Sequence, residues 1–338
     1  MNSLEELIAA YMAHRMPEAR EIVVSELSRI YGGSSQETFS FRASWQAGGE
    51  TITRRLILRR DATAGLVVAE RDLEYNVYRA LAGQGLPIPG VYFLELDPKW
   101  LERPFFIMDQ CPGKPGSPFV PTDPYDGHGT AIGEQYWSIL GQLAAIDHRA
   151  VGLESLRNGN ARIGFWALEL DRWESILDEN EALIEPAVRG AIRWLRRNPP
   201  PEPAKPSIVH GDYRSGNFLF TEDGIISAIL DWEMCHVGDP LEDVAWGLDP
   251  FWPITRHYPL DAGVARWEAA SGMPIDHAAL DWWKLFTAIK ACAIWTTASA
   301  GFASGKNREM TMALSGIRAG HFHRDLILKM MRQRGAMG

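Results

Sequence analysis

The chain has 338 residues, of which 46% are hydrophobic, so it is long enough for two lobes with buried cores. Its formal charge of −9 at pH 7 argues against a general nucleic-acid-binding protein, because such proteins carry a basic face. The chain contains three cysteines and no CxxC pair, which argues against a disulfide framework and against a zinc site.

The chain begins with a segment typical of an amphipathic helix. Residues 1–16 read MNSLEELIAAYMAHRM, in which apolar side chains recur at helical spacing. Acidic residues stand early and no cleavable apolar region follows, so we do not expect a signal peptide. We find no run that is long and apolar enough to cross a membrane, and we therefore expect a cytoplasmic protein.

Residues 22–60 predict strands joined by turns. The apolar and β-branched runs are IVVSELSRI, ETFSFRASW and TITRRLILRR. A glycine-rich turn that contains Gly32, Gly33, Ser34 and Ser35 joins the first two runs. A turn of this kind can place backbone N–H groups against phosphate oxygens, and an ordinary hairpin loop explains it at least as well.

The next elements complete a small lobe. A helix is expected at residues 66–81, and the runs VYFLEL and PFFIMDQC predict the last two strands of a small antiparallel sheet. The turn-rich stretch CPGKPGSP, which begins at Cys111, is the best domain boundary. We therefore predict an N-terminal lobe of residues 1–110 and a C-terminal lobe of residues 111–338. Helical patterns in the second lobe cover about residues 132–146, 165–180, 183–196, 280–297 and 310–331.

The most informative stretch is residues 207–233, which read SIVHGDYRSGNFLFTEDGIISAILDWE. The polar residues His210, Asp212, Asn217 and Asp231 stand where short apolar strands end and loops begin. A buried carboxylate is costly unless a partner offsets its charge. Two acids and an asparagine at strand ends therefore indicate a divalent cation with oxygen ligands. The alternative is a buried, hydrogen-bonded Asp–Asn turn.

The pattern H-G-D-x-x-x-x-N, followed by a hairpin, D-W-E and GDPLEDVAW, resembles the catalytic segment of the aminoglycoside phosphotransferase and choline kinase-like family. That family is a branch of the protein-kinase-like fold, and the segment parallels the kinase sequences H-R-D-x-x-x-x-N and D-F-G. The resemblance implies an α+β protein. Its small N-terminal lobe would contain an antiparallel sheet and one helix, and its larger C-terminal lobe would be mostly helical.

The resemblance also implies a phosphotransferase that moves the γ-phosphate of ATP, or GTP, to a hydroxyl of a small molecule. Asp212 would be the base, or orienter, for that hydroxyl, and His210 would brace the loop. Asn217 and Asp231 would hold Mg²⁺ on the nucleotide phosphates. Asp243, within GDPLEDVAW, would hold the backbone of the catalytic loop.

Residues of the first lobe acquire roles through the same resemblance. The residues that would bind the nucleotide are Gly32, Gly33, Ser34 and Ser35 in the glycine-rich turn and Met108 and Gln110 at the adenine edge. Kinases place a lysine at the end of the strand where this chain has Arg59 and Arg60. We predict that Arg59 takes its place, with Arg60 as the alternative. Glu74 would be the helix partner of this arginine.

The acceptor is expected to be a small molecule, because Asp231 and Asp239 are only a few residues apart and leave little platform for a peptide. A protein kinase is therefore disfavoured. The sequence HGDYRSGN and the strand arginine most resemble a subgroup related to the kinase domains fused to acyl-CoA dehydrogenases, which phosphorylate hydroxylated acyl thioesters. We predict a metabolite such as a hydroxyacyl compound. The alternatives are an aminoglycoside or other antibiotic and, since the strand lysine is missing, a non-catalytic nucleotide-binding module.

The late helices offer a mixture of aromatic and basic side chains that would suit an apolar or anionic acceptor. These residues are Trp282, Trp283, Lys284, Lys290 and Arg318. Packing is the better explanation for the tryptophan pair, because 13 tryptophans in one chain predict well-filled cores. We expect no nucleic-acid partner and no membrane partner.

Overall fold

The computed structural model describes residues 3–30, 36–61, 71–117, 122–156, 163–181, 183–306 and 310–335. The chain divides into two compact units. The first unit comprises Met1–Pro112 and Ala228–Glu233, and the second comprises Gly113–Ser227 and Met234–Gly338. The first boundary lies just beyond residue 110, where the N-terminal lobe was predicted to end. No local sequence signal predicts that residues 228–233 return to the first unit.

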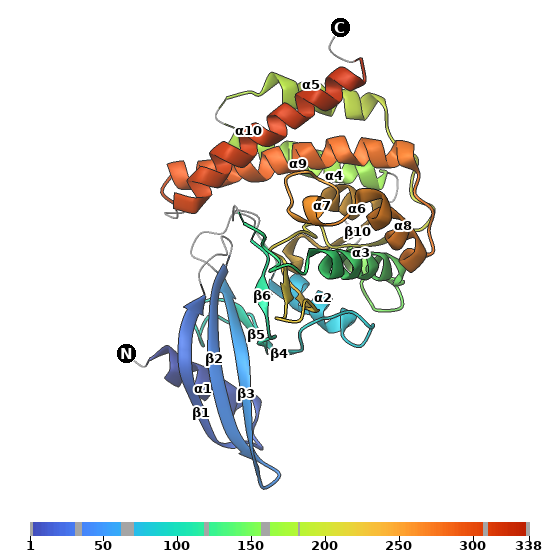
Figure 1. Cartoon of the computed structure of the whole chain (residues 1–338). Helices are drawn as coiled ribbons and strands as arrows, with labels where there is room; N and C mark the ends of the chain where they lie inside the picture. The colour runs from blue at the N-terminus through green and yellow to red at the C-terminus, as the bar shows by residue number, and fades with distance from the viewer. Residues whose placement is uncertain are drawn as a thin grey trace. The chain divides into compact units, whose positions relative to one another are not determined.

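The first unit is a small sheet with two helices (Figure 1). Its elements are α1 (Leu4–Arg15), β1 (Arg20–Ile30), β2 (Gln36–Ala47), β3 (Glu50–Asp61), α2 (Arg71–Leu81), β4 (Val91–Glu95) and β5 (Phe105–Asp109). The five strands pair antiparallel in the order β1-β2-β3-β5-β4. The predicted small antiparallel sheet is therefore confirmed, and α1 is the amphipathic helix expected at the start of the chain.

The core of the first unit fixes the position of Arg59. α1 begins with a capping box, in which Ser3 and Glu6 each accept the other's backbone N–H. Its buried face packs on the sheet. The side chains of this core include Ile8, Tyr11, Met12, Phe41, Ala43, Leu56, Leu58, Leu101, Phe105 and Ile107. Because Arg59 directly follows the fully buried Leu58 in β3, the backbone of Arg59 is held by this apolar packing.

The second unit is mostly helical (Figure 1). Its longer helices are α3 (Gly129–Ala145), α4 (Phe165–Asn180), α5 (Pro186–Arg197), α8 (Leu260–Ser271), α9 (His277–Ala303) and α10 (Met310–Gln333). Its shorter elements are β6 (Lys114–Pro115), η1 (Glu154–Leu156), β7 (Ser207–Val209), β8 (Phe218–Phe220), β9 (Ile226–Ile229), η2 (Trp232–Met234), β10 (His236–Gly238), α6 (Leu241–Gly247) and α7 (Ile254–His257). β9 and η2 lead into and out of residues 228–233. α5 begins later than predicted, because Pro186 suits the first turn of a helix.

Short strands carry the polar motif of the second unit. β7 pairs antiparallel with β10, and β6, β8 and β9 form a three-stranded sheet. A tight turn joins β8 and β9, with Gly224 at φ +72 and its N–H donating to the Thr221 carbonyl at 2.9 Å. Gln135 of α3 holds this turn, because its side-chain amide donates to the Gly224 carbonyl and accepts the Ile226 N–H.

α9 is the long, largely buried helix of the second unit. Its buried residues include Trp282, Trp283 and Lys290. By length and composition α9 could cross a membrane, which corrects the expectation that the chain has no such run. Within its most apolar window, 61% of the helix is buried in the structure, as in the core helix of a globular unit.

Candidate active site

The loop between β7 and β8 carries the H-G-D-x-x-x-x-N motif. Its backbone is held by Asp243 of α6, whose carboxylate accepts the N–H of His210 at 2.6 Å and that of Gly211 at 3.0 Å. This is the contact that the resemblance implies for Asp243. Gly211 has φ +82, and a Cβ there would lie 2.5 Å from the Met234 carbonyl oxygen, so only glycine fits. Burial and the neighbouring Glu242 raise the pKa of Asp243 to about 6.

Asp212 is almost completely enclosed, and its carboxylate accepts hydrogen bonds from three side chains. Trp246 Nε1 donates to Oδ1 at 2.9 Å, and Asn217 Nδ2 donates to Oδ2 at 2.7 Å. Arg214 Nε lies 3.0 Å from Oδ1 and 3.1 Å from Oδ2. These donors fix the orientation of the Asp212 carboxylate.

Asn217 and His210 complete the loop around Asp212. The amide nitrogen of Asn217 also donates to the Asp212 carbonyl at 2.9 Å, so the side-chain oxygen is the atom that could bind a cation. His210 is buried, and its Nδ1 accepts the Asp212 N–H at 3.2 Å. His210 therefore acts on the loop backbone, as a brace would.

A second polar cluster lies in the first unit, where Arg59 of β3 bridges two acids. Its Nη1 is 2.5 Å from Glu74 Oε1 of α2, and its Nη2 is 3.0 Å from Asp231 Oδ1. The predicted pair of Arg59 and Glu74 is present, while Arg60 instead pairs with Glu37 at 2.6 Å. Burial alone would lower the pKa of Arg59, but the charges of Glu74 and Asp231 raise it above its usual value.

Asp231 is attached to the first unit by its backbone. It has φ +71, a left-handed conformation that is uncommon outside glycine and is frequent at functional sites. Its N–H donates to the Tyr78 hydroxyl at 3.2 Å. The Ile229 N–H donates to the Pro87 carbonyl at 2.8 Å. These contacts hold the segment that presents the Asp231 carboxylate to Arg59.

The other predicted nucleotide contacts are described only in part. The glycine-rich turn lies outside the described residues and comprises Gly32, Gly33, Ser34 and Ser35. Met108 is nearly buried and pairs with Ile57 in the sheet. The Gln110 N–H donates to the Arg55 carbonyl at 3.1 Å, so this N–H is already bonded within the first unit.

Three of the five late-helix residues that were expected to suit an acceptor are core residues. Trp282, Trp283 and Lys290 are buried, and both indole N–H groups have hydrogen-bond partners. Lys284 is half-buried and Arg318 is exposed. The prediction that this mixture faces an acceptor is therefore wrong for the buried three, and packing explains the tryptophan pair.

Sequence reasoning missed Arg214 and Trp246, which donate to Asp212, and Trp252, which packs against both of them. The Arg214 guanidinium lies over the Trp252 ring, 5.1 Å from its centroid, and the rings of Trp246 and Trp252 lie 5.2 Å apart. Arg214 stands inside the motif, so its position was a usable signal. Trp246 reaches Asp212 through the packing of α6, and Trp252 packs against Trp246 from the turn after α6, which no local sequence pattern predicts.

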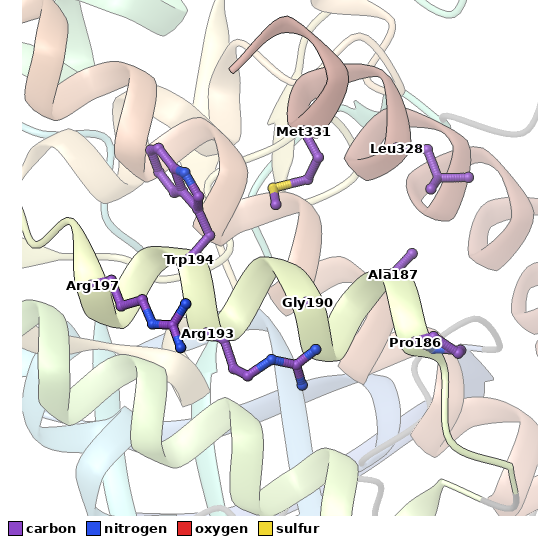
Figure 2. Close-up of a pocket in the computed structure, with 8 residues that line it drawn as sticks. All are labelled: Pro186, Ala187, Gly190, Arg193, Trp194, Arg197, Leu328 and Met331. Atoms are coloured by element: carbon purple, nitrogen blue, oxygen red, sulfur yellow. The ribbon is translucent and has the colours of Figure 1, made fainter. Parts of the chain in front are cut away.

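Two surface grooves of the second unit are separate from this site. One groove, of about 300 Å³, lies between α5 and α10, and Figure 2 shows Arg193 and Arg197 on α5 with Leu328 and Met331 on α10. The other, of about 350 Å³, is lined by residues of α4, α5, α9 and α10. Neither groove includes a residue of the loop that carries Asp212.

Comparison with known sequences agrees with this geometry. Residues 27–283 match the model of the phosphotransferase enzyme family, APH. The chain is 28% identical over 245 residues to acyl-CoA dehydrogenase family member 10 of Mus musculus, a match that covers 69% of this chain and 21% of that protein. The chain spans about a fifth to a third of the length of the curated acyl-CoA dehydrogenase relatives that it matches.

Two solved structures share the fold. A Ralstonia eutropha protein of the aminoglycoside phosphotransferase type superposes with a TM-score of 0.74 at 21% identity, over 97% of this chain and 98% of that one. A thermostable mutant of aminoglycoside phosphotransferase APH(4)-Ia, in complex with AMP-PNP and hygromycin B, gives a TM-score of 0.61 at 19% identity, over 97% and 99% of the two chains. The expected α+β, protein-kinase-like fold is confirmed. Since the family model covers most of the chain, the protein belongs to the phosphotransferase enzyme family.

Proposed function

We propose that this protein transfers the γ-phosphate of ATP, or GTP, to a hydroxyl of a small molecule in the presence of Mg²⁺. The observation that carries this proposal is the Asp212 carboxylate, which is held in one orientation by three side-chain donors inside the H-G-D-x-x-x-x-N loop. The fold relative APH(4)-Ia is solved with AMP-PNP and hygromycin B, which supports a nucleotide and a small acceptor.

Asp212 would orient the acceptor hydroxyl and receive its proton. The hydroxyl oxygen forms a bond to the γ-phosphorus, and the bond from that phosphorus to the bridging oxygen of the nucleotide breaks. Because its donors already fix the carboxylate, Asp212 needs little rearrangement for this step. Arg214 adds a positive charge beside the position where the negatively charged phosphoryl group is transferred.

Asn217 and Asp231 are the residues of this chain that would hold Mg²⁺. Their oxygens suit this cation, and the Asn217 amide nitrogen is already bonded to Asp212, which leaves its side-chain oxygen as the possible ligand. The bound cation would supply positive charge to the nucleotide phosphates.

The first-unit cluster would bind the phosphates of the nucleotide. Arg59 would supply the charge that a lysine supplies in kinases, and Glu74 would hold its guanidinium in place. The further nucleotide contacts we propose are Gly32, Gly33, Ser34, Ser35, Met108 and Gln110. A non-catalytic nucleotide-binding module is less favoured, because Asp212, Asn217 and Asp231 are all retained.

For the acceptor we favour a hydroxylated metabolite, such as a hydroxyacyl compound. The similarity to acyl-CoA dehydrogenase family member 10 supports this choice. The group beside Asp212 also supports it, because Arg214 is basic, whereas a polycationic antibiotic would require clustered acids. An antibiotic phosphotransferase is the second candidate, and the hygromycin B complex of a fold relative favours it.

Two acceptor panels, one of hydroxyacyl-CoA thioesters and one of aminoglycosides, test the proposal with labelled Mg-ATP. We expect transfer to a thioester, and Asp212→Asn serves as the inactive control on the same preparation. Efficient phosphorylation of aminoglycosides with none of the thioesters would replace the favoured acceptor by the second candidate. Tight Mg-ATP binding without transfer to any acceptor would favour the non-catalytic module.

A further inference from the structure

Next to the catalytic loop, the second unit encloses four ionisable side chains from four elements. They are Glu169 of α4, His236 of β10, Glu242 of α6 and Lys290 of α9, which we call the buried charge cluster. Each of them is 5% exposed or less. Ionised groups removed from water in this way require partners, and the contacts of the cluster lead to Asp212.

Lys290 connects the buried charge cluster to the catalytic loop. Its Nζ donates to Glu242 Oε1 at 2.7 Å and also donates to the carbonyl oxygen of Gly211. The ammonium group lies over the Trp246 ring as well, 5.4 Å from the centroid. Because Trp246 donates to the Asp212 carboxylate, Lys290 reaches Asp212 both through the backbone and through an indole ring.

The contact with Gly211 fixes the peptide bond that enters Asp212. Lys290 holds the carbonyl of this peptide, and the Asp212 N–H at its other end donates to His210 Nδ1 at 3.2 Å. The N–H of Gly211 is held by Asp243 at 3.0 Å. Glycine has access to many backbone conformations, so without Lys290 the Gly211 carbonyl would be free to turn and the Asp212 side chain would turn with it.

We propose that Lys290 is a positioning residue for phosphoryl transfer, which orients Asp212 by holding the carbonyl of Gly211. The inference rests on the proposed function, in which Asp212 receives the acceptor proton. Lys290 acts only through Gly211 and Trp246, and it is separate from the groups that would contact nucleotide or acceptor.

The rest of the buried charge cluster keeps Lys290 charged and in place. His236 Nδ1 donates to the Met234 carbonyl at 3.0 Å, which leaves Nε2 facing Glu242 Oε2 at 3.2 Å and Glu169 Oε1 at 3.8 Å. Burial alone would lower the pKa of His236, but the charges of Glu169 and Glu242 outweigh burial and raise it to about 9. With His236 protonated, the four side chains carry two positive and two negative charges, and Arg172 lies 3.7 Å from Glu169 at their edge.

The same three side chains have the composition of a metal site, because ligand atoms of Glu169, His236 and Glu242 lie within 4.8 Å of one another. A proton on His236 offsets the negative charge of the acids without a metal ion. His236 Nε2 lies 3.2 Å from one oxygen of Glu242, while the ammonium of Lys290 lies 2.7 Å from the other.

The test compares two double variants of the full-length chain, Lys290→Met/Glu242→Gln and Lys290→Gln/Glu242→Gln. Both variants remove one cation and one anion together, so neither leaves an uncompensated charge from this pair in the core. They differ in the donor, because glutamine can donate to the Gly211 carbonyl and methionine cannot. Melting temperature is measured first, followed by deuterium exchange of amides 209–213 and steady-state phosphate transfer.

We expect the methionine variant to exchange amides 209–213 faster and to lose roughly 10- to 100-fold in kcat, with the nucleotide KM unchanged. The glutamine variant should lose less by both measures. Wild-type exchange and wild-type kcat in the methionine variant would overturn the proposal. Stoichiometric zinc in the purified wild-type protein would also overturn it, because the acids would then serve a metal rather than Lys290.

Deuterium exchange separates this proposal from the proposed function. If the wild-type protein transfers no phosphate to any acceptor, the proposed function fails. The exchange comparison then still decides whether Lys290 holds the loop, since it requires neither nucleotide nor acceptor.

Discussion

The two charged clusters both pair acids with basic side chains, but only the cluster of Arg59, Glu74 and Asp231 contains a partly exposed acid. In the first unit, Arg59 bridges Glu74 and Asp231, and the side chain of Asp231 remains 31% exposed. In the second unit, every member of the buried charge cluster is almost fully enclosed. An ion pair that stays open on one side can exchange a partner for a ligand, whereas an enclosed pair can only hold other groups in place. Enclosure, more than residue type, therefore separates the proposed binding group from the proposed positioning group.

The largest effect is expected when Asp212, which the buried charge cluster is proposed to position, is replaced. Asp212→Asn keeps the size of the side chain but cannot accept the acceptor proton, so turnover should fall by roughly 10²- to 10⁴-fold. The rate of phosphate transfer from labelled Mg-ATP measures this loss, with an unchanged melting temperature as the control for folding. Unchanged turnover in this variant would remove Asp212 from the chemistry.

Removing one charge from the buried charge cluster by a single substitution should lower the free energy of unfolding. Lys290→Met removes one of the two cations that the buried Glu242 faces, so the free energy of unfolding should fall by up to about 3–5 kcal/mol. Denaturant unfolding measures the change. The matched control is Lys329→Met on the exposed face of α10, which should change stability little. Equal effects of the two substitutions would contradict the distinction between enclosed and open sites.

The buried charge cluster should also make the free energy of unfolding depend on pH. The cluster of Arg59, Glu74 and Asp231 should not do so in the same pH range. The pKa of His236 is raised to about 9 from an ordinary 6.5, so the folded state binds this proton more tightly than the unfolded chain does. The resulting stabilisation is complete below pH 6.5 and is lost as pH rises through 9. The free energy of unfolding should therefore fall across this window by up to about 3 kcal/mol.

A pH series of denaturant unfolding curves measures this slope, and His236→Gln should flatten it. The acids Asp239 and Asp243, whose burial raises each pKa to about 6, titrate below the window. A slope that persists unchanged in His236→Gln would assign the titration to another group.

The smallest effect is expected at the cluster of Arg59, Glu74 and Asp231. Arg59→Ala removes a charged donor to the nucleotide, which is worth roughly 1.5–3 kcal/mol, so the nucleotide KM should rise by about 10- to 100-fold. Arg59→Lys should retain part of the activity because it keeps the charge. Arg60→Ala is the matched control, since Arg60 pairs with Glu37 instead. A KM that rises as much in Arg60→Ala as in Arg59→Ala would exclude a specific role for Arg59.

Sequence patterns predicted contacts between residues that are close in the chain and contacts of residues that belong to a known motif. The strands of the small sheet follow from alternation and turn residues, and the pair of Arg59 with Glu74 was implied by the resemblance to the kinase-like family. Asp243 could be assigned to the loop backbone because the motif GDPLEDVAW carries it.

Contacts that depend on long-range packing could not be predicted in this way. Lys290 lies 79 positions from Gly211 along the chain, and as a lysine on an apolar helix it has no sequence signal for its buried partner. The indole of Trp246 reaches Asp212 across 34 positions, and Asp231, in the segment that joins the first unit, reaches Arg59 across 172 positions. The same limit explains why the tryptophan pair of α9 could suggest an acceptor surface before its burial was known.

Calorimetric titration of Mg-ATP into wild-type protein, Asp212→Asn and Arg59→Ala tests most directly whether Arg59 binds the nucleotide while Asp212 accepts the proton. We expect Asp212→Asn to bind Mg-ATP with wild-type affinity while it fails to transfer phosphate, and Arg59→Ala to bind Mg-ATP about 10- to 100-fold more weakly. Loss of binding in Asp212→Asn, or wild-type binding in Arg59→Ala, would contradict the division into a nucleotide-binding cluster in the first unit and a proton-accepting site in the second.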